Sequence, residues 1–155
     1  MKKKIGIGVL AALIILQFVR PSRNQSEEII TENDISKKYT ITESAHQVLV
    51  KKCYDCHSNN THYPWYTNIQ PIGLWMQHHV NEGKDELNFS VFNTYPERKA
   101  NHKLEEISDA VNEGWMPLDS YLWVHKDAEV NQEDREAINS WIKSLGIVFE
   151  KKPKP

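Results

Sequence analysis

Cys53-Tyr54-Asp55-Cys56-His57 is the most informative stretch of the sequence, and it contains both cysteines of the 155-residue chain. The order Cys-x-x-Cys-His is the attachment pattern of a c-type haem. Each thiol forms a thioether with one porphyrin vinyl group, and the histidine lies under the ring as a ligand to iron. The pattern predicts one covalent haem c and its iron, held by Cys53 and Cys56 and ligated by His57. The intervening Tyr54 and Asp55 are not required by this chemistry.

Three other kinds of site use closely spaced cysteines. A thioredoxin-like dithiol usually opens a helix in an alternating strand and helix pattern, which this sequence lacks. A structural zinc site needs four ligands, and the chain has no further cysteine and no suitably spaced histidine pair. A disulfide between residues so close in sequence would be strained. Haem attachment is therefore the favoured interpretation, with these three as alternatives.

Met116 is the predicted second ligand to iron. It follows a helix stop at Gly114, and Pro117 biases its backbone toward an extended shape. The thioether therefore lies on a loop and outside any helical stripe. Methionine and histidine ligation raises the reduction potential, which suits electron transfer. The alternative role for Met116 is to fill a gap in the core.

Several other side chains compete for the second position. His78 and His79 are the first alternatives, and either would give a bis-histidine site of lower potential. They are neighbours on a predicted helix, so they point in different directions. Weaker candidates are Met76, His102 and His125.

His57 also needs an acceptor for its other ring nitrogen. A backbone carbonyl in the Tyr63-Pro64 or Gln70-Pro71 region is the candidate.

The N-terminus has the pattern of a retained secretion signal. Three lysines precede an apolar run from Ile5 to Val19, which is somewhat short of the ~20 residues of a full membrane span. No small-x-small cleavage site follows, although cleavage stays an alternative. Residues 1–23 are therefore predicted to be a signal anchor in a bacterial inner membrane. The lysines favour a cytoplasmic N-terminus and a domain in the periplasm, where covalent haem attachment takes place.

The charge of the chain is divided unevenly. Residues 1–23 hold five basic residues and no acidic residue, which leaves 14 basic and 21 acidic residues, a net charge of −7, in the remainder. An acidic domain argues against binding to nucleic acid. It is suited to redox partner proteins with a basic surface, although a solvated acidic surface without a partner explains the charge equally well.

The rest of the chain predicts an all-α, cytochrome c-like domain around the haem. We expect a linker over residues 24–42, a haem-binding domain over 43–148 and a tail over 149–155. Helices are expected from Thr42 or Ser44 to about Lys52, over 71–82 with Gly83 as its end, over 102–113 and over 132–145. All five tryptophans follow the cysteine motif, and the soluble part is poor in aliphatic residues. A porphyrin would give these rings an apolar body on which to pack; the alternative is an aromatic core without a cofactor, and the composition alone does not separate the two.

Longer stretches of the sequence resemble a known family. Residues 53–66 (CYDCHSNNTHYPWY), 75–80 (WMQHHV) and 87–90 (LNFS) look like the small membrane-anchored haem-binding domains of bacteria. Residues 114–117 (GWMP) and the helix with Trp141-Ile142 resemble the distal half of class I cytochromes c. The resemblance covers roughly residues 40–148. It implies a cytochrome c-like fold, covalent haem, and ligation by His57 and Met116.

These observations favour a c-type cytochrome that transfers electrons at the outer face of the membrane and is not itself an enzyme. The alternatives are a peroxidase-like haem enzyme or a sensor with an open position on iron, an accessory domain to such an enzyme, or a module without haem.

Overall fold

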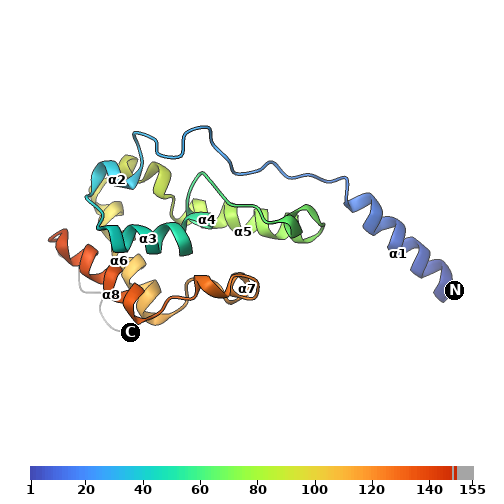
Figure 1. Cartoon of the computed structure of the whole chain (residues 1–155). Helices are drawn as coiled ribbons and strands as arrows, with labels where there is room; N and C mark the ends of the chain where they lie inside the picture. Colours follow the sequence, from blue (N-terminus) through green and yellow to red (C-terminus); the bar gives the residue numbers. More distant parts are fainter. Residues whose placement is uncertain (148, 150–155) are drawn as a thin grey trace.

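The computed structural model describes residues 1–147 and 149, and the regular elements in them are all helical (Figure 1). Extended pairing within this part of the chain is limited to one isolated bridge between Gln25 and Asn60. The predicted all-α class is confirmed. The elements are α1 (Lys2–Leu16), α2 (Ile35–Lys38), α3 (Glu43–Lys52), α4 (Tyr54–His57), η1 (Trp65–Asn68), α5 (Ile72–Glu86), η2 (Phe89–Thr94), α6 (Glu97–Glu113), α7 (Asp119–Leu122), η3 (Lys126–Ala128) and α8 (Gln132–Ser144).

The core lies where α3, α6 and α8 pack together, with α2 and η2 on one side. Trp141 of α8 is completely buried, and its indole nitrogen donates to the Thr40 carbonyl at 3.1 Å. Phe92 of η2, Leu49 of α3 and Leu104 of α6 are also completely buried. This core forms from aliphatic residues and a few aromatic ones, because each of the long helices turns an apolar stripe inward.

Local signals explain most helix ends. Thr42 caps α3, Gly114 ends α6 with a φ of 76°, and Asn131 forms a capping box with Asp134 at the start of α8. The predicted end of α5 at Gly83 is wrong, because the helix continues to Glu86. The predicted start of the next helix at residue 102 is also late, since α6 begins directly after Pro96.

The N-terminal helix α1 projects from the domain, and none of its residues is buried (Figure 1). Among the described residues, no helix combines the length and the apolar content that a membrane crossing requires.

The segment after α1 is hydrogen-bonded to the domain over much of its length. The Asn24 side-chain amide donates to the Ser58 carbonyl and to Thr61 Oγ1, at 2.7 and 2.9 Å. Thr31 Oγ1 donates to the Ser90 carbonyl at 2.8 Å, and Ile35 is completely buried in the core. The residues expected to form a linker are therefore held against the domain. Apart from Phe149, the expected tail lies outside the described residues.

Candidate functional site

The cysteine motif lies at the junction of two helices. Cys53 ends α3, where its backbone N–H donates to the Leu49 carbonyl at 2.9 Å, and it also precedes α4. The His57 N–H donates to the Cys53 carbonyl at 3.0 Å, which closes a single turn. Both cysteines are free thiols. One turn of helix thus presents Cys53, Cys56 and His57 together.

These three residues line an apolar cavity of about 540 Å³. That volume lies within the roughly 300–1,000 Å³ of small-molecule and cofactor sites. The other walls come from α5, the second half of α6 and the segment that follows α6. The main apolar contributors are Ile72, Trp75, Met76, Leu87, Phe89, Ile107, Val111, Trp115, Met116, Leu118 and Val130. An apolar cavity therefore lies beside His57.

One nitrogen of the His57 ring contacts two backbone carbonyls, and the other is free to bind a metal. Its Nδ1 lies 2.8 Å from the Gly83 carbonyl and 3.0 Å from the Leu87 carbonyl. Carbonyl oxygens only accept, so Nδ1 carries the proton and Nε2 keeps its lone pair. Burial lowers the pKa of His57, although the two carbonyls oppose that shift. The ring is therefore neutral near pH 7 with Nε2 free to coordinate a metal.

The acceptors for Nδ1 differ from those predicted. They are backbone carbonyls, as expected, but they belong to the end of α5 and not to the Tyr63-Pro64 or Gln70-Pro71 region. The sequence carried one signal for this contact, the glycine inside a helical pattern at position 83. A Cβ atom at Gly83 would lie 2.8 Å from the Cys56 carbonyl oxygen and 3.2 Å from Cys56 Cβ. Gly83 allows α5 to approach α4 closely, which explains why the helix runs through this glycine.

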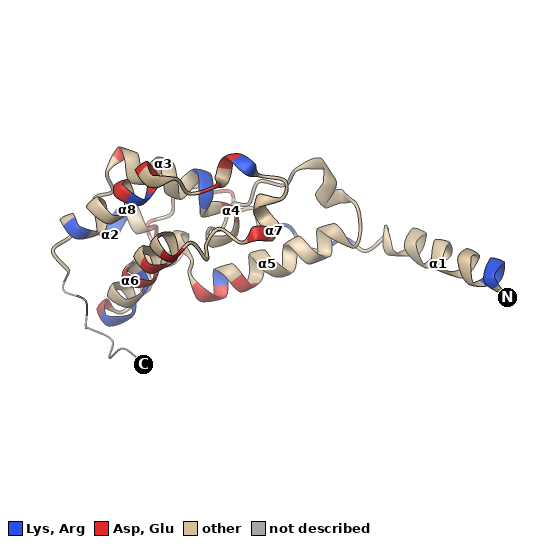
Figure 2. Ribbon diagram, turned by 90° about the horizontal axis from the view of Figure 1, so that it is seen from below, with Lys and Arg blue, Asp and Glu red and all other residues tan. Residues whose placement is uncertain are grey.

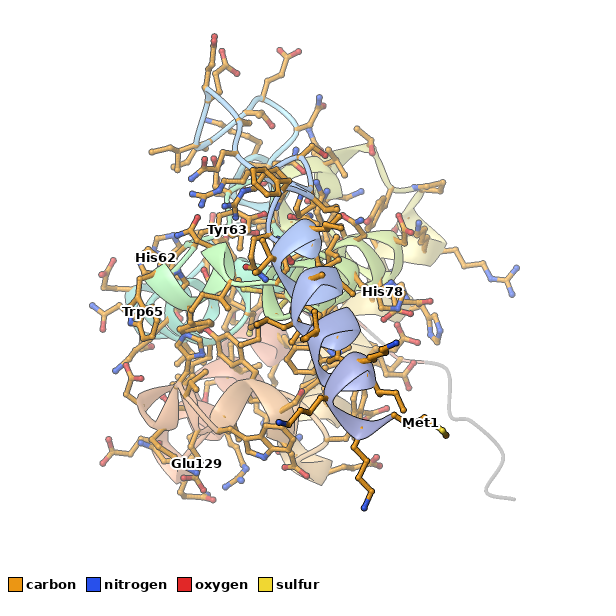
Figure 3. All side chains as sticks on the ribbon, turned by 90° about the vertical axis from the view of Figure 1, so that its right-hand side faces the viewer. Met1, His62, Tyr63, Trp65, His78 and Glu129 are labelled. Carbon is orange, nitrogen blue, oxygen red and sulfur yellow. The ribbon has the colours of Figure 1, made fainter. Side chains whose placement is uncertain are left out.

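The candidates for the second ligand to iron differ in whether they line the cavity. Met116 lines the cavity, on the segment between α6 and α7. His79 and Met76 line it from α5. His78 does not line the cavity, and its side chain is 65 % exposed near Glu82 (Figure 3). Adjacent positions on a helix point in different directions, which separates His78 from His79.

His79 has a buried atom without a partner. Its Nδ1 makes no hydrogen bond, because the nearest carboxylate oxygen, on Glu82, is 3.6 Å away. Trp75 packs on the ring with centroids 4.5 Å apart. A buried polar atom without a partner, on a residue that lines the cavity, is a group that a ligand could satisfy. An apolar cavity, an imidazole with a free Nε2 and this unsatisfied nitrogen together fit a large apolar group that carries a metal and polar substituents.

A family model described as a haem-binding domain matches residues 11–144. The chain belongs to this family. The chain is therefore a haem-binding domain, and the cavity beside His57 is the candidate site for haem; we call it the haem cavity. No curated protein and no solved structure matches the chain.

Both thiols of this haem-binding domain favour the protonated form. Burial raises the pKa of Cys53 to about 12, with a further increase from the neighbouring Cys56, and Lys52 opposes the shift. Burial and then the charge of Asp55 raise the pKa of Cys56 to about 11. Thiols with a raised pKa are weak nucleophiles near neutral pH, because little thiolate is present.

Asp55 has a structural role that the sequence did not indicate. Its Oδ1 accepts from the His62 N–H at 3.0 Å, and its Oδ2 accepts from the Tyr121 hydroxyl at 2.8 Å. Tyr121 belongs to α7, which follows Met116 by a few residues. Asp55 therefore links the cysteine motif to the segment that carries Met116 in the cavity wall.

The tryptophans divide into three groups. Trp75 and Trp115 line the haem cavity, and Trp141 belongs to the core. Trp65 and Trp123 are 74 % and 71 % exposed and do not line the cavity. Two of the five tryptophans are therefore placed where a haem in this cavity would contact them.

Proposed function

We propose that this haem-binding domain is a c-type cytochrome that carries electrons between redox partner proteins at the outer face of a bacterial inner membrane. The observation that carries the proposal is that Cys53, Cys56, His57 and Met116 line one apolar cavity. When bound, haem supplies a one-electron couple between ferric and ferrous iron. The protein would tether the group, provide the two axial ligands and exclude water.

Covalent attachment needs only what the two cysteines and the porphyrin supply. Each thiol adds across one vinyl group, so that sulfur bonds to one carbon and a proton ends on the other. No group leaves and no net oxidation occurs. The unpaired state of Cys53 and Cys56 supports this role, because a disulfide between them would block both additions.

The geometry of His57 favours Met116 over His79 as the second ligand. The two nitrogens of an imidazole face different ways, so Nε2 points away from the α5 carbonyls that hold Nδ1. His79 lies on α5 itself, one turn before Gly83. Met116 comes from a different wall, after α6. The segment after α6 is therefore a better source than α5 for a ligand on the porphyrin face opposite His57.

The proposed location rests on the N-terminal segment. Residues 2–16 form a helix without buried residues, and most of its side chains are apolar. Lys2, Lys3 and Lys4 precede the apolar part, which favours a cytoplasmic N-terminus and a domain in the periplasm. A helix of this length would need its flanking basic side chains to reach the headgroups.

Covalent attachment is tested by haem staining after denaturing electrophoresis of the purified protein. The wild-type band should keep its stain, and the Cys53→Ala/Cys56→Ala variant should lose it. A wild-type band without stain would exclude a c-type haem while leaving non-covalent haem binding intact.

The second ligand is tested with Met116→Ala in the ferric protein. We expect loss of the methionine-to-iron charge-transfer band at the red end of the visible spectrum and a lower reduction potential. Met76→Ala is the matched control, because Met76 lines the same cavity from α5. If Met76→Ala removed the band and Met116→Ala kept it, the assignment of Met116 would be wrong.

A further inference from the structure

Two segments of the domain, residues 64–81 and 114–125, carry most of its exposed large apolar side chains. Among the described residues after position 30, nine such side chains are exposed, and Val50 alone lies outside the two segments. The two segments contain one Asp, Glu, Lys or Arg residue, Asp119, in a chain with 40 of them. They lie together, since the Tyr66 hydroxyl is 3.2 Å from His125 Nε2. We call residues 64–81 and 114–125 the apolar end of the domain.

The haem cavity accounts for only part of this exposure. Ile72, Trp75, Trp115, Leu118 and Val124 line the cavity, so a bound haem would contact them. Trp65, Ile69 and Trp123 do not line it, yet they are 74 %, 44 % and 71 % exposed. Two exposed tryptophans and an isoleucine in segments nearly free of charged residues indicate an interaction surface beyond the cavity.

The apolar end is also the end from which α1 leaves the domain. The Gln17 side chain exchanges two hydrogen bonds with the Gln70 backbone, at 3.0 and 2.9 Å. Arg20 donates to the Asn68 carbonyl and Arg23 to the Asn68 side-chain oxygen, each at 2.7 Å. Seen from the α1 side, the helix stands in front of the domain, with Trp65 to one side of it (Figure 3). Any bilayer that holds α1 would therefore lie next to residues 65–70.

Acidic residues are absent from the α1 side of α5 and frequent at its other end. The half of α5 nearest α1 has no charged residue, and its other end carries Glu82, Lys84, Asp85 and Glu86 (Figure 2). At the α1 side, Arg20 and Arg23 come before any acidic residue of the chain. Arginine side chains next to apolar and tryptophan side chains suit the interface of a bilayer, where a basic group can reach a lipid phosphate.

We propose that the apolar end of the domain rests on the lipid surface, with Trp65, Ile69 and Trp123 among the headgroups. This inference rests on the proposed anchoring by α1. A lipid surface is favoured over a protein partner because the residues directly after α1, Gln17, Arg20 and Arg23, are hydrogen-bonded to this same end. Tryptophan suits the position, since its ring is apolar and its N–H can reach the polar headgroups. The acidic remainder of the domain then faces the aqueous side.

The test uses the full-length haem-loaded protein in vesicles of phosphatidylcholine and phosphatidylglycerol that contain a diazirine-bearing phospholipid. After illumination and digestion, mass spectrometry identifies the peptides that carry lipid. We expect adducts in α1 and also in peptides that contain Trp65, Ile69 and Trp123. Peptides from α6, α8 and the exposed pair Ile29 and Ile30 should remain free of lipid.

Adducts in α1 alone would overturn the lipid contact of the apolar end but support the membrane anchor. A protein partner would then be the better occupant of the apolar end. Adducts in neither place would overturn both. Adducts at the apolar end without α1 would support the surface and overturn the anchor. In the Trp65→Gln/Ile69→Gln/Trp123→Gln variant, adducts at the apolar end should be lost while the haem spectrum is unchanged. The matched control is Ile29→Gln/Ile30→Gln, which should keep the wild-type pattern.

Discussion

Asp55 shows how one side chain can unite the two halves of the haem site. It lies between the two cysteines, and it accepts from Tyr121 of α7 and from the His62 backbone. Tyr121 also stacks on His125, with ring centroids 4.1 Å apart. The carboxylate raises the pKa of Tyr121, after burial, which is the larger cause. The wall that carries Met116 is therefore tied to the motif through a charged hydrogen bond.

We expect Asp55→Ala to destabilise the folded protein by about 1–3 kcal/mol, because Tyr121 would lose its partner in a partly buried position. The segment with Met116 should become more mobile, so the methionine-to-iron band should weaken. Urea unfolding followed by haem absorbance measures the first effect, and the ferric spectrum measures the second. Tyr66→Phe is the control, since its hydroxyl contacts only His125. A full-strength band in Asp55→Ala would show that Asp55 does not position the Met116 segment.

The two thiols predict a specific response to alkaline pH. Their folded pKa values, about 12 for Cys53 and about 11 for Cys56, are higher than the ordinary thiol value of about 8.5. Stability from a raised pKa is complete below the ordinary value and is lost as pH rises through the folded value. In the haem-loaded protein the sulfurs are thioethers and do not titrate. Haem-free protein should therefore lose more stability between pH 9 and 12, as measured by circular dichroism on both forms. Parallel loss in the two forms would contradict burial of the thiols.

The residues of the motif were predictable because their chemistry depends on local spacing. Cys53, Cys56 and His57 are adjacent in sequence, and one helical turn brings them together. The Gly83 and Leu87 carbonyls and the Tyr121 hydroxyl lie 26, 30 and 66 residues from their partners. Such contacts arise from the packing of α5 and α7, so no local pattern reveals them.

At the scale of elements, two contacts hold the motif in place: α3 against α8, and α4 against α5. Lys52, the last residue of α3, forms an ion pair with Asp134 of α8 and donates to the Glu129 carbonyl at 2.6 Å. The two side chains are 7 % and 15 % exposed. A pair this well enclosed is costly to break, because the remaining charge stays buried.

Lys52→Met should therefore destabilise the protein by about 3 kcal/mol, since Asp134 would be left without its cation. The neighbouring Lys51 provides a matched control. Its pair with Asp127 spans 3.4 Å, but the side chains are 55 % and 72 % exposed, so Lys51→Met should cost well under about 1 kcal/mol. Denaturant unfolding of both variants measures the difference. Equal losses would show that the Lys52 pair is screened by water.

Gly83 is the second critical contact between elements. Gly83→Ala would place a methyl group 2.8 Å from the Cys56 carbonyl oxygen, so α5 and α4 must separate. We expect lower haem content and a shifted ferric spectrum, because the His57 contact with the Gly83 carbonyl would lengthen. Asp85→Ala, at an exposed position of the same helix that does not line the cavity, is the control and should behave as wild type. An unchanged haem spectrum in Gly83→Ala would show that the helices adjust without disturbing His57.

The helices themselves were largely predictable, and the reasons for failure are specific. α3 and α8 have side-chain caps and clear apolar stripes, so their ends were expected within a residue or two. α5 was predicted too short because glycine usually ends a helix. Here the close approach of Cys56 to Gly83 requires glycine within the helix instead.

At the scale of the whole molecule, the core and the haem cavity are largely distinct. Fourteen buried apolar residues form the core cluster, and most of them, including Trp141, Leu49 and Leu104, lie away from the cavity lining. The sequence led us to expect a core that depends on porphyrin, because its composition shows few aliphatic residues after the N-terminal run. Composition does not reveal how α3, α6 and α8 gather those residues in one place.

This division predicts that removal of haem loosens one side of the molecule and leaves the other folded. In the Cys53→Ala/Cys56→Ala variant without haem, the walls formed by α5 and residues 114–125 face a cavity of about 540 Å³. Apolar walls that lose their contents also lose dispersion contacts and become hydrated.

Amides of residues 72–80 and 114–125 should therefore exchange with deuterium faster than in the haem-loaded protein. Amides of α3 and α8 should keep most of their protection, because Trp141 and Leu49 pack in the core and not on the haem. If protection were lost throughout, the core would depend on haem after all, as the composition first indicated.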